Sequence, residues 1–179
     1  MLIKKILPYG AAAGLIAGVP LSLMGLNIGG QLSSSLGMAL GYLTMLVAFS
    51  LIFVAIKRRR DQDQGGVIRF WPALGQGLGI SLVASVCYAL CWETALALSG
   101  MDFAGEYAKL LIEQQRAQGV SGEALAAFTA EMEQFKTQYA DPLYRLPMTL
   151  AEIFPVGLLV SLVSAGLLRN PRFLAAPRG

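Results

Sequence analysis

Residues 36–60 read LGMALGYLTMLVAFSLIFVAIKRRR, an uninterrupted apolar run that ends in four consecutive basic residues. The apolar part, residues 36–56, is long enough as a helix to cross the hydrocarbon core of a bilayer, which takes about 20 residues. The basic cluster of Lys57, Arg58, Arg59 and Arg60 then ends the span, as cations do at the boundary with the headgroups. This stretch therefore predicts a membrane-spanning helix with an anchored end.

Three further apolar runs cover about residues 6–28, 72–98 and 147–168. A cleaved signal peptide is an alternative for the first run, but the run is long for one and no small-residue cleavage site follows it. The third run begins beside Phe70 and Trp71, aromatic residues that suit the headgroup level, and Pro72 suits the first turn of a helix. We therefore expect an all-α membrane protein, with four transmembrane helices in a single domain over residues 1–179.

The polar segment 100–146, between the third and fourth runs, has apolar residues at helical spacing. Gly119 divides it, and Ser121 is a candidate N-cap for the second part. We predict helices at residues 102–117 and 122–139, which form an amphipathic hairpin on the extracytoplasmic side. The hairpin can pack against itself, the bilayer surface or the mouth of the bundle. The residues that we expect it to bury are Tyr107, Leu111, Phe128, Met132 and Phe135.

The distribution of charge predicts the orientation, because short cytoplasmic loops carry the excess of Lys and Arg. With the N-terminus inside, ten of the 14 basic residues are cytoplasmic. They are Lys4, Lys5, Lys57, Arg58, Arg59, Arg60, Arg69, Arg169, Arg172 and Arg178. Four spans return the C-terminus to the same side, so both termini should be cytoplasmic. The cluster at 57–60 should also contact anionic lipid, beyond its role as an anchor.

The composition excludes several classes of function. The chain has no histidine, which removes imidazole bases, the usual catalytic triads and most zinc-enzyme patterns. We therefore expect no enzymatic activity, no cofactor and no metal. The net charge of +3 does not indicate nucleic-acid binding, because the cations flank apolar runs. Cys87 and Cys91, one helical turn apart in an apolar run, are interpreted as small buried residues.

Small residues recur at four-residue spacing in three of the spans. Such spacing lets helices approach closely in lipid, where no hydrophobic force drives them together. The glycines could pack within one chain or, from an exposed face, form a homo-oligomer. They are Gly10, Gly14 and Gly18 in the first span, Gly37 and Gly41 in the second, and Gly75 and Gly79 in the third.

Glu93 and Glu152 are the two acids inside apolar runs, where a charge is costly and often functional. At 1.5 Å per residue, Glu93 lies roughly 33 Å from Trp71 and Glu152 roughly 24 Å from Leu168, so both belong to the outer leaflet. The alternatives are two interfacial carboxylates that reach water and a paired proton or cation site. Pro155 removes a helix hydrogen bond and frees the carbonyl of the residue beside Glu152. The paired site would include Glu93, Glu152, Tyr88, Trp92 and Pro155.

The chain also resembles a known family along nearly its whole length. The most specific matches are Trp92-Glu93 at the end of the third run and Glu152-x-Phe154-Pro155-Val156-Gly157 at the start of the fourth. Others are Gly41-Tyr42, Ile56-Lys57, Arg60-Asp61, Gly65-Gly66, Tyr88, Tyr139, Pro142 and Ser161. Their order and spacing resemble the bacterial inner-membrane proteins of domain of unknown function 4199. That family usually has an aromatic residue where this chain has Arg59. The resemblance implies four spans and a bacterial inner membrane, and it implies no activity.

Two functional hypotheses remain. The first is a non-enzymatic membrane interaction or scaffold protein, whose outer hairpin binds a membrane or periplasmic protein or a second copy of the chain. The second is a small oligomeric transporter or ion-coupled protein that uses the two glutamates. The first predicts a stable assembly without substrate flux, and the second predicts flux that depends on both acids.

Overall fold

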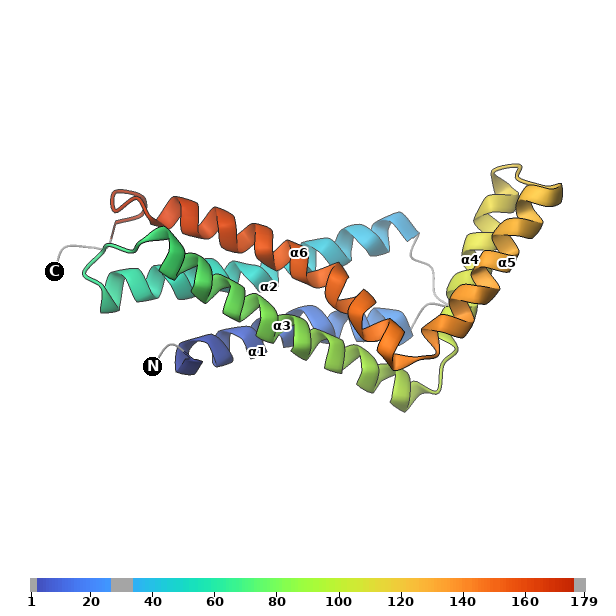
Figure 1. Ribbon diagram of the computed structural model, residues 1–179, viewed down its shortest axis with the longest axis horizontal. Coiled ribbons are helices and arrows are strands. Elements are labelled where there is room, and N and C mark those ends of the chain that lie inside the picture. Colours follow the sequence, from blue (N-terminus) through green and yellow to red (C-terminus); the bar gives the residue numbers. More distant parts are fainter. Residues whose placement is uncertain (1–2, 27–33, 176–179) are drawn as a thin grey trace.

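The computed structural model describes residues 3–26 and 34–175, and six helices account for most of them (Figure 1). No strand occurs in these two ranges. Four of the six helices are long and apolar enough to cross a membrane, which confirms the all-helical class and the number of spans expected from hydropathy. The six are α1 (Ile3–Leu26), α2 (Ser34–Asp63), α3 (Phe70–Ser99), α4 (Phe103–Ala117), α5 (Gly122–Tyr139) and α6 (Pro142–Leu168), of which α1, α2, α3 and α6 are the candidate spans.

The helix ends differ from the predicted spans by a few residues. Helix α2 continues past the apolar run to Asp63, so the basic cluster at 57–60 is helical. Helix α6 begins at Pro142 instead of residue 147, because the Asp141 carboxylate accepts a hydrogen bond from the backbone N–H of Leu143 at 2.9 Å and caps it. The predicted end of the first span at residues 27–28 and Arg178 lie outside the described residues.

The bundle has two ends (Figure 1), and the charged residues at these ends differ. Helices α1 and α3 start, and α2 and α6 finish, at the same end of the bundle, which we call the basic end. The opposite end, from which α4 and α5 project, we call the hairpin end. The cations of the basic cluster, together with Lys4, Lys5 and Arg169, therefore come together from sequence positions far apart.

Helices α1 and α3 lie against each other because the glycines of α1 leave no side chain between them. A Cβ atom added at Gly10, Gly14 or Gly18 would come within 2.5–2.9 Å of a Cβ on α3. The residues that these glycines face on α3 are, in the same order, Val83, Cys87 and Cys91. The shared order means that the two helices run parallel, as the first and third spans of one chain must. These three glycines are occupied within the chain and do not offer a free face to a second copy.

The other glycines of the predicted packing set differ in whether they contact a neighbouring helix. A Cβ at Gly79 would meet the side chain of Ile6 on α1 at 2.7 Å, which continues the contact between α1 and α3. Gly37, Gly41 and Gly75 have nothing within 4 Å of an added Cβ. These three glycines therefore make no close helix contact among the described residues, although their spacing is the same.

Helices α3 and α6 cross through a reciprocal pair of small residues. An added Cβ at Gly77 would lie 2.7 Å from the hydroxyl of Ser161, and one at Gly157 would lie 2.6 Å from the hydroxyl of Ser81. The two serine hydroxyls are 3.2 Å apart, and all of these serine atoms are buried. Each hydroxyl also donates to a carbonyl of its own helix, so no polar group is left unsatisfied at the crossing.

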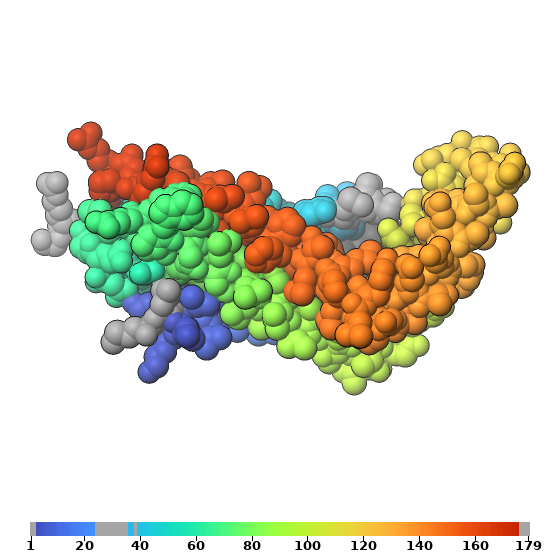
Figure 2. Space-filling view, in the orientation of Figure 1, coloured from blue at the N-terminus to red at the C-terminus, as the bar shows by residue number. Residues whose placement is uncertain are grey.

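The amphipathic segments form a hairpin that leaves the bundle at a steep angle (Figures 1 and 2). Gly100, with φ of 60°, ends α3 in the left-handed region that favours glycine, and Asp102 caps α4 by accepting from the N–H of Gly105 at 2.9 Å. Ser121 precedes α5 without a capping side-chain hydrogen bond. The hairpin meets the bundle mainly at its base.

The hairpin buries its apolar stripes less completely than the sequence predicted. Tyr107 is 39% exposed. The other four residues of the predicted stripes, Leu111, Phe128, Met132 and Phe135, are only half-buried. The buried residues of the two hairpin helices are Ala104, Gly105 and Ala108 near the start of α4 and Tyr139 at the end of α5, so burial is concentrated at the base of the hairpin. The rest of the apolar surface stays accessible.

One member of the basic cluster is not available to lipid, which corrects the prediction for Arg60. Its guanidinium is fully buried and donates to the carbonyls of Phe173 at 2.8 Å and Leu174 at 2.7 Å. It also forms an ion pair with Asp61 at 2.7 Å. Arg60 therefore ties the segment after α6 to the end of α2, while Lys57, Arg58 and Arg59 remain at least partly exposed.

Candidate functional site

The hairpin end brings six polar and aromatic side chains together, from three helices. We call this group the polar junction: Tyr88, Trp92 and Glu93 from α3, Tyr139 from α5, and Arg145 and Glu152 from α6. Tyr88 and Trp92 are one turn apart, so they lie on the same face of α3, and both are buried. Glu93 is next to that face and is partly buried.

Trp92 and Tyr139 join the hairpin to α3. The indole N–H of Trp92 donates to the Tyr139 hydroxyl at 2.8 Å, and the bond is buried. The ring of Phe103, at the start of α4, packs edge-on against Trp92 with centroids 4.8 Å apart. Phe135 packs on Tyr139 at 5.3 Å, so an aromatic cluster fills the base of the hairpin. Burial raises the pKa of the Tyr139 phenol, which keeps it neutral as a hydrogen-bonding group.

Arg145, on α6, also fixes the base of the hairpin. Its Nε and Nη2 atoms donate to the two carboxylate oxygens of Glu93 at 2.6 and 2.5 Å, which is the bidentate geometry of a strong ion pair. Its Nη1 atom donates to the backbone carbonyl of Tyr139 at 2.8 Å, and the guanidinium lies 5.4 Å from the centroid of that ring. Both charged side chains are mostly buried, with 13% of Arg145 and 23% of Glu93 exposed. Arg145 therefore links α3, the end of α5 and the start of α6.

This contact corrects the prediction that Glu93 and Glu152 face each other as a carboxylate pair. Glu93 is neutralised by Arg145, so it has no need to share a proton or a cation with a second acid. The proposed cation site loses one of its two carboxylates for the same reason. No hydrogen bond joins Glu93 to Glu152 in the part of the chain that the structure describes, where both carboxylate oxygens of Glu93 accept from Arg145.

Glu152 and Tyr88 form the remaining part of the predicted site. The Tyr88 hydroxyl is fully buried and makes no hydrogen bond of good geometry within the described ranges, although the Glu152 carboxylate lies near enough to be its acceptor after a small movement. Glu152 is exposed as a residue, yet its carboxylate lies close enough to interact electrostatically with the phenols of both Tyr88 and Tyr139. Pro155 lies within α6, which remains one continuous helix through it. A buried donor without a well-placed acceptor is uncommon and marks a place where a water molecule, an ion or a moved side chain can bind.

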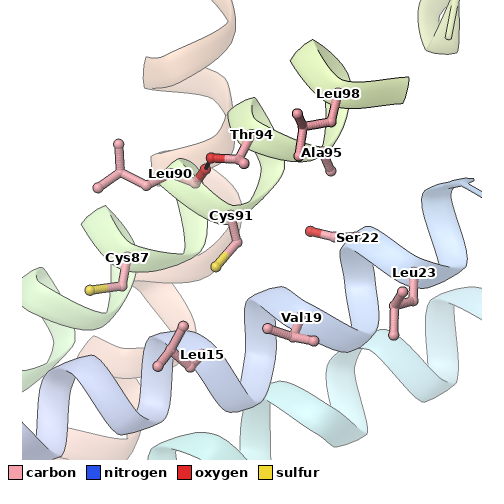
Figure 3. Close-up of a pocket in the computed structure, with 10 residues that line it drawn as sticks. All are labelled: Leu15, Val19, Ser22, Leu23, Cys87, Leu90, Cys91, Thr94, Ala95 and Leu98. Atoms are coloured by element: carbon pink, nitrogen blue, oxygen red, sulfur yellow. Dashed lines mark hydrogen bonds between the residues drawn. The ribbon is translucent and has the colours of Figure 1, made fainter. Parts of the chain in front are cut away.

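A second concave feature is an apolar groove of about 440 Å³ between α1 and α3, near the hairpin end (Figure 3). Cys87 and Cys91 reach it from α3, and Leu15 and Val19 line it from α1. Both thiols are free and half-buried, less buried than the sequence predicted. The groove's hydroxyls, Ser22 and Thr94, each donate to a carbonyl of their own helix, so the groove offers little polar recognition.

Arg145 and Tyr139 are the residues of the polar junction that sequence reasoning did not assign to it. In the sequence, Arg145 is one of the four cations outside the predicted cytoplasmic set, and Tyr139 ends the predicted helix 122–139. A signal for Arg145 was present: it lies two residues before Pro147 at the start of an apolar run, where a cation needs a partner or the interface. The identity of that partner depends on tertiary structure.

The fold and the polar junction together define a multi-pass helical membrane protein with a clamped hairpin at one end. The chain belongs to the family described as protein of unknown function DUF4199, which it matches over residues 9–170. No curated protein and no solved structure matches it. The match confirms the family that the sequence resembled, and it covers both the polar junction and most of the basic end.

Proposed function

We propose that this chain is a non-enzymatic protein of the bacterial inner membrane whose hairpin binds another protein outside the cytoplasm. The observation that carries the proposal is a hairpin that is rigidly held at its base and incompletely buried along its length. The clamp between Glu93 and Arg145 and the bond between Trp92 and Tyr139 fix its direction. A fixed, partly apolar surface that projects from a membrane domain suits recognition, because little conformational freedom is lost on binding.

The orientation is part of the proposal. Nine of the ten cations predicted to be cytoplasmic lie in the described ranges, and they belong to the helix ends and connections of the basic end. Four other cations, Lys109, Arg116, Lys136 and Arg145, belong to the hairpin end beside a larger number of acids. This asymmetry favours cytoplasmic termini and an extracytoplasmic hairpin.

The surface that we assign to the partner includes Tyr107 and Leu110 on α4, which are 39% and 38% exposed. A photo-crosslinking amino acid placed at Leu110 should capture the partner in native membranes. The matched control is the same amino acid at Glu131, a polar exposed position on α5 of the same hairpin. A product of twice the chain's mass would identify the partner as a second copy. Equal yields at the two positions, or none at Leu110, would contradict a binding role for this face.

The second candidate function is an oligomeric, proton- or cation-coupled transporter. The buried Tyr88 hydroxyl beside the Glu152 carboxylate is the observation that favours it. Because Glu93 is paired with Arg145, the coupling group would be Glu152 alone. Glu152→Gln should then abolish proton-linked flux in reconstituted vesicles, whereas flux that is the same in Glu152→Gln and the wild type would exclude this role.

A further inference from the structure

A pocket at the basic end combines uncompensated positive charge with a position at the membrane surface. It has a volume of about 280 Å³ and lies between α1, α2 and α3. The polar and charged residues that the argument uses are Lys4, Lys5, Tyr9, Arg58, Arg59 and Gln76. We call it the basic pocket. It lies at the opposite end of the bundle from the polar junction, and no acidic side chain lines it.

Most of its cations are not neutralised by the chain itself. Lys5 is paired with Asp63, but Lys4 has no ion pair within the described ranges. Arg58 donates to two neutral acceptors, the Tyr9 hydroxyl at 3.4 Å and the side-chain carbonyl of Gln62 at 3.1 Å. These contacts orient the guanidinium and leave its charge available. A guanidinium has five N–H donors, so most of them remain free for an anion.

The inner wall of the basic pocket is fixed by a buried amide. Gln76 is fully buried, and its side-chain NH₂ donates to the Ala55 carbonyl at 3.2 Å. Its side-chain oxygen must then face the other way, where it accepts from Nη1 of Arg59 at 3.3 Å. The same Nη1 atom lies 3.3 Å from the carbonyl of Pro72, so the Arg59 guanidinium is held in one position. A guanidinium fixed by neutral groups is arranged in advance for a phosphate oxygen.

The level of the basic pocket suits a lipid headgroup. Trp71, which is 76% exposed at the start of α3, marks the interface and lies five residues, about one and a half turns, before Gln76. Leu7, which lies between the pocket residues Lys5 and Pro8 on α1, and Val54, which is next to Ala55 on α2, are 51% and 47% exposed. A molecule with its phosphate in the basic pocket could therefore lay its acyl chains on apolar surface nearby.

We infer that the basic pocket binds the phosphate of an anionic phospholipid headgroup. Its volume equals that of roughly nine water molecules at about 30 Å³ each, which leaves room for a phosphate and part of a glycerol. Basic pockets between membrane helices on the cytoplasmic side are a known way to select anionic lipids over neutral ones. The inference is separate from the proposed role of the hairpin, and either can fail without the other.

The test compares the affinity of the full-length chain for two lipids by native mass spectrometry in a neutral detergent. The probes are dioleoylphosphatidylglycerol and dioleoylphosphatidylcholine. The double variant Lys4→Gln with Arg58→Gln removes two exposed cations of the pocket, and circular dichroism checks that it folds. The matched control, Arg169→Gln with Arg172→Gln, removes two exposed cations from the same end of the bundle, outside the pocket.

We expect the pocket variant to lose about 30-fold in affinity for phosphatidylglycerol and the control less than about threefold. The charge-preserving pair Lys4→Arg with Arg58→Lys should retain binding. Equal losses in the pocket and control variants would overturn the inference, because the effect would then be one of general surface charge. Displacement of the lipid by millimolar inorganic phosphate would also overturn it, since the pocket would then bind free phosphate. Equal affinity for the two lipids would overturn the inference as well, because the basic pocket would then not distinguish an anionic lipid from a neutral one.

Discussion

The clamp at the base of the hairpin makes a quantitative prediction about Arg145. Replacing Arg145 with Met removes three hydrogen bonds, two to the Glu93 carboxylate and one to the Tyr139 carbonyl. Hydrogen bonds to charged groups contribute about 1.5–3 kcal/mol each in buried sites. Polar contacts within membrane helices contribute less, about 0.6 kcal/mol on average. We therefore expect Arg145→Met to lower the free energy of unfolding by about 2–4 kcal/mol, between these limits.

The assay is a double-mutant cycle with Glu93→Gln, measured by unfolding in sodium dodecyl sulfate from neutral detergent micelles. The two single changes should be non-additive, with a coupling energy of about 1–2 kcal/mol. In a Trp71→Phe background, the emission of Trp92 should shift to the red as the base of the hairpin opens. Lys109→Met is the control, because Lys109 forms only an exposed ion pair with Glu106 at 2.8 Å and should change stability by less than about 0.5 kcal/mol. A coupling energy within about 0.5 kcal/mol of zero would refute the clamp.

Three further predictions address other parts of the chain. Gly14→Ala should destabilise the bundle by about 1–3 kcal/mol, because its Cβ would meet α3, whereas Gly41→Ala should be nearly neutral. Equal unfolding midpoints for the two variants would contradict the close contact between α1 and α3. Tyr88→Phe should cost less than about 0.5 kcal/mol, since its buried hydroxyl meets no acceptor in good hydrogen-bonding geometry, and a loss above about 1.5 kcal/mol in the same titration would show that the nearby Glu152 carboxylate accepts from it. Arg60→Gln should release residues 169–175 and speed their cleavage by trypsin about tenfold, while Lys57→Gln should leave the rate of cleavage unchanged. Similar rates for the two variants would contradict the role of Arg60 in holding this segment.

The number of spans could be predicted from the sequence because a bilayer imposes a length and a polarity that local composition reveals. The hairpin helices were also predictable, since Gly119 and Asp141-Pro142 mark where helical periodicity stops. The membrane side of the hairpin and its partner remain predictions. Both depend on the membrane and the proteins around the chain, and the contacts within the chain carry no information about these.

The partners of individual side chains were harder to predict, because helix spacing does not identify the opposite helix. Gly37 and Gly41 have the same spacing as Gly10 and Gly14, yet only the latter pair packs against another helix among the described residues. Glu93 was matched in depth to Glu152, but depth alone does not give the angle around a helix axis, and Arg145 reaches Glu93 from the first turn of α6.

The burial of Arg60 could have been predicted from the sequence. Ile52, Ile56 and Arg60 follow one another at four-residue spacing, so they share a face of α2, and all three are fully buried. The phase of the apolar stripe thus separates Arg60 from Lys57, Arg58 and Arg59. The carbonyls that accept from Arg60 come from residues 173 and 174, beyond the last apolar run. Only the folded chain brings them there.

The central claim is that the basic end faces the cytoplasm and the hairpin lies outside it. Its most direct test is a set of reporter fusions after residues 32, 63, 120 and 179, of which the fusion at 120, in the turn between α4 and α5, is decisive. We predict that the reporters read outside, inside, outside and inside, with an extracytoplasmic signal at 120. A cytoplasmic signal at 120 would contradict both the orientation and the proposed role of the hairpin.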